Sequence, residues 1–106
     1  MMNSRTKGHD FERKIAAKLR DIWPNCITSR AGNPQADQSG VDLVNTSQFN
    51  FQLKAMERSP TYHSILDQMP KDGNYNVILH KRNRKGIIAV MYFDDFIKII
   101  KSKNFD

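Results

Sequence analysis

Hydrophobic and polar residues follow two different periods along the chain, and each period predicts its own kind of element. A helix is predicted from about residue 8 to residue 22, because apolar residues recur there every three or four positions, and Pro24 and Asn25 end it. Its apolar stripe consists of Phe11, Ile15, Leu19 and Ile22. The polar and basic residues 1–7 before it are expected to fray.

Short apolar or alternating segments, separated by residues that favour turns, predict the strands. They cover residues 26–30, 41–44, 49–56, 76–80 and 87–93. A loop is predicted at 31–40, a short helix at 61–69, and Asp94 or Asp95 is expected to cap a final helix. The inward residues of that helix are expected to be Phe96, Ile97 and Ile100. The order αβββαββα predicts a single α/β domain with a central mixed sheet flanked by helices.

The segment from residue 49 to residue 54 alternates strictly between apolar and polar residues. In a strand, its polar side chains, Asn50, Gln52 and Lys54, share one face, while its apolar side chains face the core. Asp42 joins the polar face if it pairs opposite Gln52, which leaves a hairpin loop of three residues. The shared face is then either a site that combines a carboxylate, an amide and an ammonium group, or an ordinary solvated surface.

Glu12 lies on the predicted first helix at the edge of its buried face, where a carboxylate can reach a cleft between helix and sheet. Alternatively, it complements the helix dipole, as acidic residues near a helix start do. Metal-dependent phosphodiester cleavage needs oxygen ligands for a hard divalent cation, and a lysine that supports the attacking water or the phosphate charge. Glu12, Asp42, Gln52 and Lys54 could supply these groups.

The charge of the chain favours a polyanionic partner. Lys and Arg number 17 against 11 Asp and Glu, a net charge of +6 in 106 residues, which indicates nucleic acid or an anionic surface unless it serves solubility alone. Arg30 could hold a phosphate oxygen or be solvated. The densest basic run forms a turn and is either a phosphate contact or solvated; it contains Lys81, Arg82, Arg84 and Lys85.

The single cysteine, Cys26, excludes an internal disulfide and a cysteine-based zinc site, and we expect it to be a buried structural thiol in a reducing compartment. No apolar run approaches the length needed to span a membrane, and the N-terminal residues contain no signal-peptide core. We therefore expect a cytoplasmic protein that has no membrane partner.

Several short motifs, taken in order, resemble a known family. They are Lys7-Gly8-x-x-Phe11-Glu12, Ser29-Arg30-Ala31-Gly32, Asp42-Leu43-Val44 and Gln52-Leu53-Lys54. Together they resemble the PD-(D/E)XK nuclease superfamily, and within it the archaeal-type Holliday junction resolvases and their phage-encoded relatives. The resemblance covers about residues 5–100 and implies a restriction-endonuclease-like αβββαβ core.

The resemblance also implies a function: Mg²⁺-dependent cleavage of DNA, with Mn²⁺ able to substitute, by a homodimer that resolves branched DNA. The place of action is the cytoplasm, which is that of the host cell if the protein is phage-encoded. The resemblance further implies that Glu12 and Asp42 are acidic site residues, that the Leu53 carbonyl is a metal ligand and that Lys54 is the catalytic lysine. Gln52 departs from the family pattern, which usually has an acid at this position.

A glutamine carbonyl oxygen can still ligate a hard cation, but it is neutral, so metal should bind more weakly. Gln52 is therefore a natural ligand, an introduced inactivating change, or a sign that catalysis has been lost. The last of these gives the alternative function, a non-catalytic DNA-binding module that kept the nuclease fold. An RNA-binding or RNA-cleaving domain is a weaker alternative.

Overall fold

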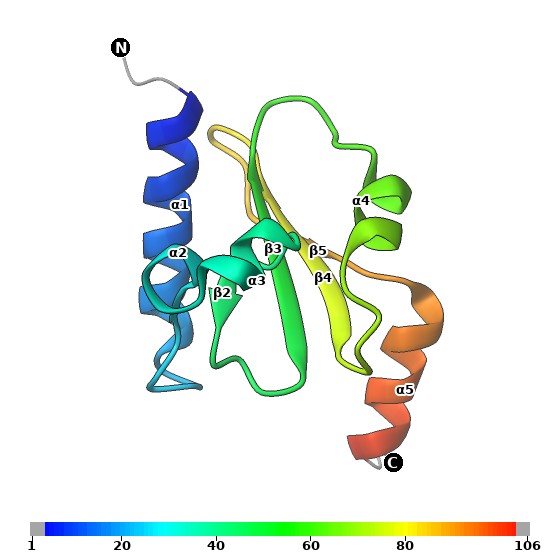
Figure 1. The fold of residues 1–106 in the computed structure, drawn as a ribbon. Helices are drawn as coiled ribbons and strands as arrows, with labels where there is room; N and C mark the ends of the chain where they lie inside the picture. Colours follow the sequence, from blue (N-terminus) through cyan, green and yellow to red (C-terminus); the bar gives the residue numbers. More distant parts are fainter. Residues whose placement is uncertain (1–3, 104–106) are drawn as a thin grey trace.

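The structure, a computed structural model, describes residues 4–103 and forms an α/β domain in which a mixed sheet lies between helices (Figure 1). Helix α1 packs on one face of the sheet and α4 on the other, and α5 follows the last strand. The elements in chain order are α1 (Ser4–Leu19), β1 (Ile27–Thr28), α2 (Ser29–Gly32), α3 (Pro34–Gln38), β2 (Leu43–Val44), β3 (Phe49–Ala55), α4 (Tyr62–Gln68), β4 (Tyr75–Lys81), β5 (Ile88–Val90) and α5 (Phe93–Lys103).

The central sheet has the order β3-β4-β5, with β4 parallel to β3 and antiparallel to β5. This arrangement confirms the predicted mixed sheet with flanking helices. The parallel register pairs Phe51 with Val77 and Gln52 with Ile78. Because parallel strands need a crossover connection, α4 is the helix that makes it between β3 and β4. The two short strands β1 and β2 pair with each other in a separate antiparallel sheet.

The alternation predicted for β3 is confirmed by the way the two faces of the sheet are covered. Phe51 and Leu53 join the hydrophobic cluster that contains Phe11 and Ile15 of α1. The opposite face of the sheet packs against α4 and forms a smaller cluster of Leu66, Met69 and Ile78. Cys26 is fully buried in the α1 cluster, as expected, and burial raises the pKa of its thiol.

The polar face of β3 is not an ordinary solvated surface, because Asn50 is only 6% exposed. The Asn50 amide nitrogen donates to an Asp72 carboxylate oxygen at 3.1 Å and to the Asn76 side-chain oxygen at 2.9 Å. The Asn76 amide donates in turn to the Pro70 carbonyl at 2.9 Å. These bonds satisfy the buried amides and fix the turn before β4 on the sheet, which gives Asn50 a structural role.

Helix α1 begins earlier and ends earlier than predicted. Residues 4–7, expected to fray, belong to the helix, since none of them breaks it and Gly8 costs only about 1 kcal/mol in its interior; residues 1–3 lie outside the described part. The helix ends at Leu19, whose carbonyl accepts from the Ile22 and Trp23 amides. This turn places Trp23 against Phe49 at 5.9 Å between ring centroids and leaves Ile22 64% exposed, so Ile22 is not part of the buried stripe.

The predicted loop at 31–40 contains two short helices, and the strand predicted at 26–30 is correspondingly short. Ser29 and Arg30 begin α2 and do not extend β1. Asn33 starts α3 as its N-cap, because its side-chain oxygen accepts from the Ala36 amide at 3.3 Å, and Pro34 follows at the first helical position.

The hairpin expected between residues 41–44 and β3 is not formed. Strand β2 pairs with β1, in the register Thr28 opposite Leu43. The backbone amide of Asp42 donates to the Phe51 carbonyl at 2.8 Å. The predicted pairing of Asp42 opposite Gln52 is therefore wrong. The Asp42 carbonyl accepts from the Ser29 amide at 2.8 Å.

The C-terminal elements differ from the prediction in their bounds and in the orientation of Phe96. Strand β5 is shorter than the predicted 87–93, and helix α5 begins at Phe93, so Asp94 and Asp95 lie in its first turn and neither is its cap. Phe93 is 69% exposed and Phe96, expected to face inward, is 47% exposed. Within the described residues, no helix is both long and apolar enough to cross a membrane.

Candidate active site at the edge of β3

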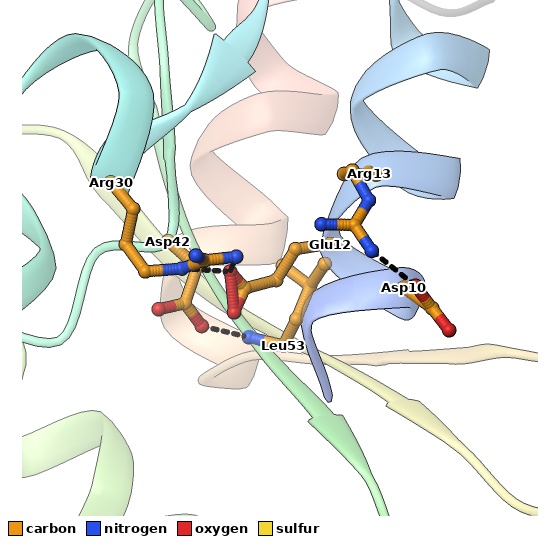
Figure 2. Close-up of polar contacts among 6 residues, drawn as sticks. All are labelled: Asp10, Glu12, Arg13, Arg30, Asp42 and Leu53. Atoms are coloured by element: carbon orange, nitrogen blue, oxygen red, sulfur yellow. Dashed lines mark hydrogen bonds and ion pairs between the residues drawn. The ribbon is translucent and has the colours of Figure 1, made fainter. Parts of the chain in front are cut away.

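The candidate site is centred on Asp42, whose side chain lies against the edge of β3 (Figure 2). The Leu53 amide donates to Asp42 Oδ2 at 2.7 Å. In a strand, the N–H and C=O groups of one residue point to the same side. The Leu53 carbonyl therefore faces the same edge as the Asp42 carboxylate, and two kinds of oxygen donor meet there.

Glu12 reaches this edge from α1, and Arg30 reaches it from α2 (Figure 2). The Arg30 Nε and Nη2 atoms lie 3.4 and 3.5 Å from Glu12 Oε2. The Glu12 side chain is only 13% exposed, so this ion pair neutralises a carboxylate that is largely removed from water. The pair that Asp10 forms with Arg13 lies elsewhere on α1 and does not contribute to the site.

Burial raises the pKa of the Asp42 carboxyl to about 6 from its ordinary value of 3.8. The Leu53 amide bond lowers it, the neighbouring Glu12 and Asp37 carboxylates raise it, and the Lys54 ammonium lowers it. Asp42 is thus a carboxylate whose charge is under-compensated by its neighbours, and either a proton or a cation would stabilise it. The contribution of Asp37 was not predicted, because no sequence pattern places the 31–40 segment beside Asp42.

The side chains of Gln52 and Lys54 lie on the same face of β3 and contact each other. With the Gln52 amide oriented so that its nitrogen donates to the Gly40 carbonyl at 3.1 Å, its oxygen accepts from Lys54 Nζ at 3.3 Å. Gly40 has a φ of +86° and approaches so closely that a Cβ there would lie 3.1 Å from the end of the Gln52 side chain. The backbone conformation therefore favours glycine, and a larger residue would also displace the end of the Gln52 side chain by a few tenths of an ångström.

A cavity of about 410 Å³ opens beside Gln52 on the α4 side of the sheet. Its lining contains no charged residue and consists of Gln38, Ser39, Gly40, Gln52, Gln68 and Pro70. This cavity gives a ligand access to the Gln52 amide from solvent.

The donors at this edge are of the type that Mg²⁺ and Mn²⁺ prefer: a carboxylate from Asp42, the backbone carbonyl of Leu53 and the amide of Gln52. They fit a hard divalent cation in kind. Their charge is low, since among residues 4–103 no three His, Cys, Asp or Glu side chains converge closely enough to hold a metal ion. The Glu12 carboxylate contacts Arg30 through Oε2 alone, so its other oxygen could add a charged donor.

The basic turn predicted to contact DNA divides its residues between two other cavities. Lys81 lines a cavity of about 380 Å³ that also contains Lys7 and Lys14 of α1. Arg82 and Lys85 line a different cavity, on the α4 side. The turn therefore presents basic groups in two directions and does not form a single strip.

Ser29 is a further polar residue near the site that the sequence did not single out as functional. It is fully buried, and its hydroxyl is the only buried side-chain polar group without a hydrogen-bond partner in the described part of the chain. Its amide donates to the Asp42 carbonyl at 2.8 Å, which ties α2 to the residue at the centre of the site.

Comparison of the chain with protein-family models, curated proteins and solved structures finds no match. What the site can do chemically therefore follows from its own residues. A carboxylate of raised pKa, two neutral oxygen donors and a lysine ammonium at one strand edge can bind a cation, and can place a positive charge beside an anionic substrate.

Proposed function

We propose that this protein is a metal-dependent DNA endonuclease of the PD-(D/E)XK kind that hydrolyses phosphodiester bonds in branched DNA such as Holliday junctions. One observation carries the proposal: the Asp42 carboxylate is anchored on the Leu53 amide, and the adjacent residue of the same strand is Lys54. An acid, a backbone carbonyl and a lysine brought together at one sheet edge are the groups this chemistry requires. The element order and the net charge of +6 support it.

Each residue has a distinct part in the proposed reaction. Asp42 and the Leu53 carbonyl would hold Mg²⁺, which supplies Lewis-acid polarisation of the phosphate and a more acidic bound water. The Lys54 ammonium stabilises the negative charge that develops on the phosphate oxygens. Gln52 fixes that ammonium by its 3.3 Å contact and offers its amide as a further ligand. Glu12 raises the pKa of Asp42 and so favours a cation nearby.

The second candidate function is a DNA-binding module without catalysis, and two observations favour it. Glu12 is already paired with Arg30 through Oε2, and Gln52 is neutral where an acid would strengthen metal binding. Both candidates require DNA binding, and only the first requires a metal-dependent nick.

The test uses labelled four-way junction, matched duplex and single-stranded DNA, each with Mg²⁺, Mn²⁺ or EDTA. We expect metal-dependent nicks, strongest on the junction, that Asp42→Asn and Lys54→Ala both abolish while DNA binding persists. Lys18→Ala is the matched control, since Lys18 is an exposed lysine near the end of α1, and it should cut at the parent rate. Binding without cleavage in every metal would contradict the endonuclease and favour the binding module.

We also propose that the protein acts as a homodimer, because paired nicks across a branch require two sites related by a two-fold axis. The exposed apolar residues of β5 and α5 support this proposal. Ile88 is 50% exposed, and a cavity of about 450 Å³ is lined by Ala89, Val90, Met91, Phe93 and Phe96. A free strand edge next to exposed aromatic residues is a surface that a second copy can cover.

A further inference from the structure

A cavity separate from the Asp42 site lies between the start of α4 and the turn that joins β4 to β5. Its volume is about 310 Å³, and it is lined by Ser59, Tyr62, His80, Arg82, Lys85, Gly86 and Ile88. The register that pairs His80 with Ile88 places both side chains on the α4 face of the sheet, so the cavity has an ordered floor. Two of the lining residues are cations and none is an acid.

The positive charge of this cavity is not neutralised by neighbouring carboxylates. Within the described part of the chain, neither Arg82 nor Lys85 forms an ion pair. The Glu57 carboxylate, which accepts from the Asn83 amide at 2.8 Å, does not line the cavity. An anion between the two cations would relieve their mutual repulsion, whereas an empty cavity leaves it in place.

The guanidinium of Arg82 is positioned by a side-chain contact. Arg82 Nη2 donates to Ser59 Oγ at 2.6 Å, which uses one of its five N–H groups and leaves the rest for a ligand. The Ser59 hydroxyl accepts this bond with its oxygen, so its own proton can be donated elsewhere. A planar guanidinium held in this way, with a hydroxyl beside it, matches the bidentate geometry of a phosphate group.

The floor of the cavity is fixed by a buried histidine. His80 is 2% exposed, and its Nε2 lies 2.8 Å from the Met56 carbonyl, which can only accept, so Nε2 carries a proton. In the neutral ring, Nδ1 then accepts from the Tyr62 hydroxyl at 2.8 Å. Tyr62 is thereby held in one orientation, and its ring and Ile88 form an apolar wall beside the two cations.

We propose that this cavity binds a phosphate group of a nucleic acid strand. Arg82 and Lys85 supply the charge, the Ser59 hydroxyl supplies a further donor, and Tyr62 with Ile88 contacts the adjoining sugar or base. The proposal does not depend on cleavage, because none of these residues belongs to the Asp42 site. It also separates the basic turn into functional halves, since Lys81 lines the other cavity, with Lys7 and Lys14.

The test measures binding in EDTA with the Asp42→Asn variant as background, so that its outcome is independent of nuclease activity. The ligands are inorganic phosphate, a short single-stranded oligonucleotide and the same oligonucleotide with a 5′-phosphate. Calorimetry gives the affinities, and NMR shifts of the Gly86 amide and the His80 ring report occupancy of the cavity. Free phosphate measures the shared chemistry, and the two oligonucleotides show whether an internal or a terminal phosphate is bound.

We expect Arg82→Gln and Lys85→Gln each to weaken oligonucleotide binding by about tenfold or more and to lower the salt dependence by about one released counterion. Lys81→Gln and Arg84→Gln are the matched controls from the same turn and should leave the Gly86 and His80 shifts on binding unchanged. Equal losses in all four variants, or shifts on binding that survive both Arg82→Gln and Lys85→Gln, would overturn the proposal. Binding of free phosphate but of neither oligonucleotide would overturn its assignment to a nucleic acid strand.

Discussion

Replacing Asp42 by asparagine should stabilise the protein at neutral pH, even though it removes the central residue of the candidate site. The amide keeps an oxygen that can accept the Leu53 N–H bond and removes a charge that burial disfavours. The pKa of Asp42 is about 6 in the folded protein and close to 3.8 in the unfolded chain. The difference corresponds to about 2–3 kcal/mol at 1.36 kcal/mol for each pH unit.

The direction in which stability changes with pH follows from the raised pKa of Asp42. Because the folded-state pKa is raised, the folded protein holds its Asp42 proton more tightly, and the parent loses stability as the pH rises from about 4 to above 6. The asparagine of the variant does not titrate. The free energy of unfolding of Asp42→Asn should therefore match or fall slightly below that of the parent near pH 4, and exceed it by about 2 kcal/mol at pH 7.5.

Urea unfolding at several pH values between about 4 and 8 measures this difference, with Asp21→Asn as the control because Asp21 is exposed just after the end of α1. Millimolar Mg²⁺ or Mn²⁺ should raise the unfolding midpoint of the parent and leave that of Asp42→Asn unchanged, since a bound cation compensates the buried carboxylate. A difference between parent and variant that stays constant across the pH range would refute the reasoning. It would mean that Asp42 is ionised at no cost in the folded protein.

Three further predictions address the metal, the core and the oligomeric state. Gln52→Glu should tighten Mg²⁺ binding measured by calorimetry, because it adds a negative charge at the cation; an unchanged affinity would mean that residue 52 is not a ligand. Asn50→Ala should lower the free energy of unfolding by about 1–3 kcal/mol, since the Asn76 side chain loses its buried donor; a smaller loss in urea would show that water replaces the amide. Phe93→Ser combined with Phe96→Ser should give a monomer by light scattering under conditions in which the parent is a dimer; a monomeric parent would remove the symmetric resolvase.

The sequence was most informative where a single period controls a whole element. The strict alternation of β3 predicted its length to within one residue and the face of each side chain, because a strand between two packed layers admits no other register. The short helix predicted at 61–69 corresponds to α4 and was equally well defined by its local residues.

The sequence was less informative where tertiary contacts override a local pattern. Ile22 fits the helical stripe, yet the chain leaves the helix so that Trp23 can pack on the aromatic residues of β3. The predicted hairpin between residues 41–44 and β3 was wrong because β2 pairs with β1, and no local pattern specifies that partner. In contrast, α3 could have been predicted, since Asn33 followed by Pro34 is a helix-start signal.

The same distinction holds for the candidate site. The shared face of Gln52 and Lys54 followed from strand parity. The pairing of Glu12 with Arg30 did not, because it joins residues 18 positions apart across two helices. The influence of Asp37 on Asp42 likewise depends on a folded segment that the sequence predicted only as a loop.

The bond from the Leu53 amide to the Asp42 carboxylate stands where a regular sheet would use a backbone carbonyl. The β1–β2 pair is thus joined to the central sheet partly through a side chain that can rotate away, and such a joint opens locally at a lower free energy than a continuous ladder. Amide hydrogen exchange should then show different protection in the β1–β2 pair and in the central sheet, and the Leu53 amide should exchange faster than its neighbours within β3. A cation bound at Asp42 would hold the carboxylate in place, slow that exchange and make the two sheets open as a single cooperative unit.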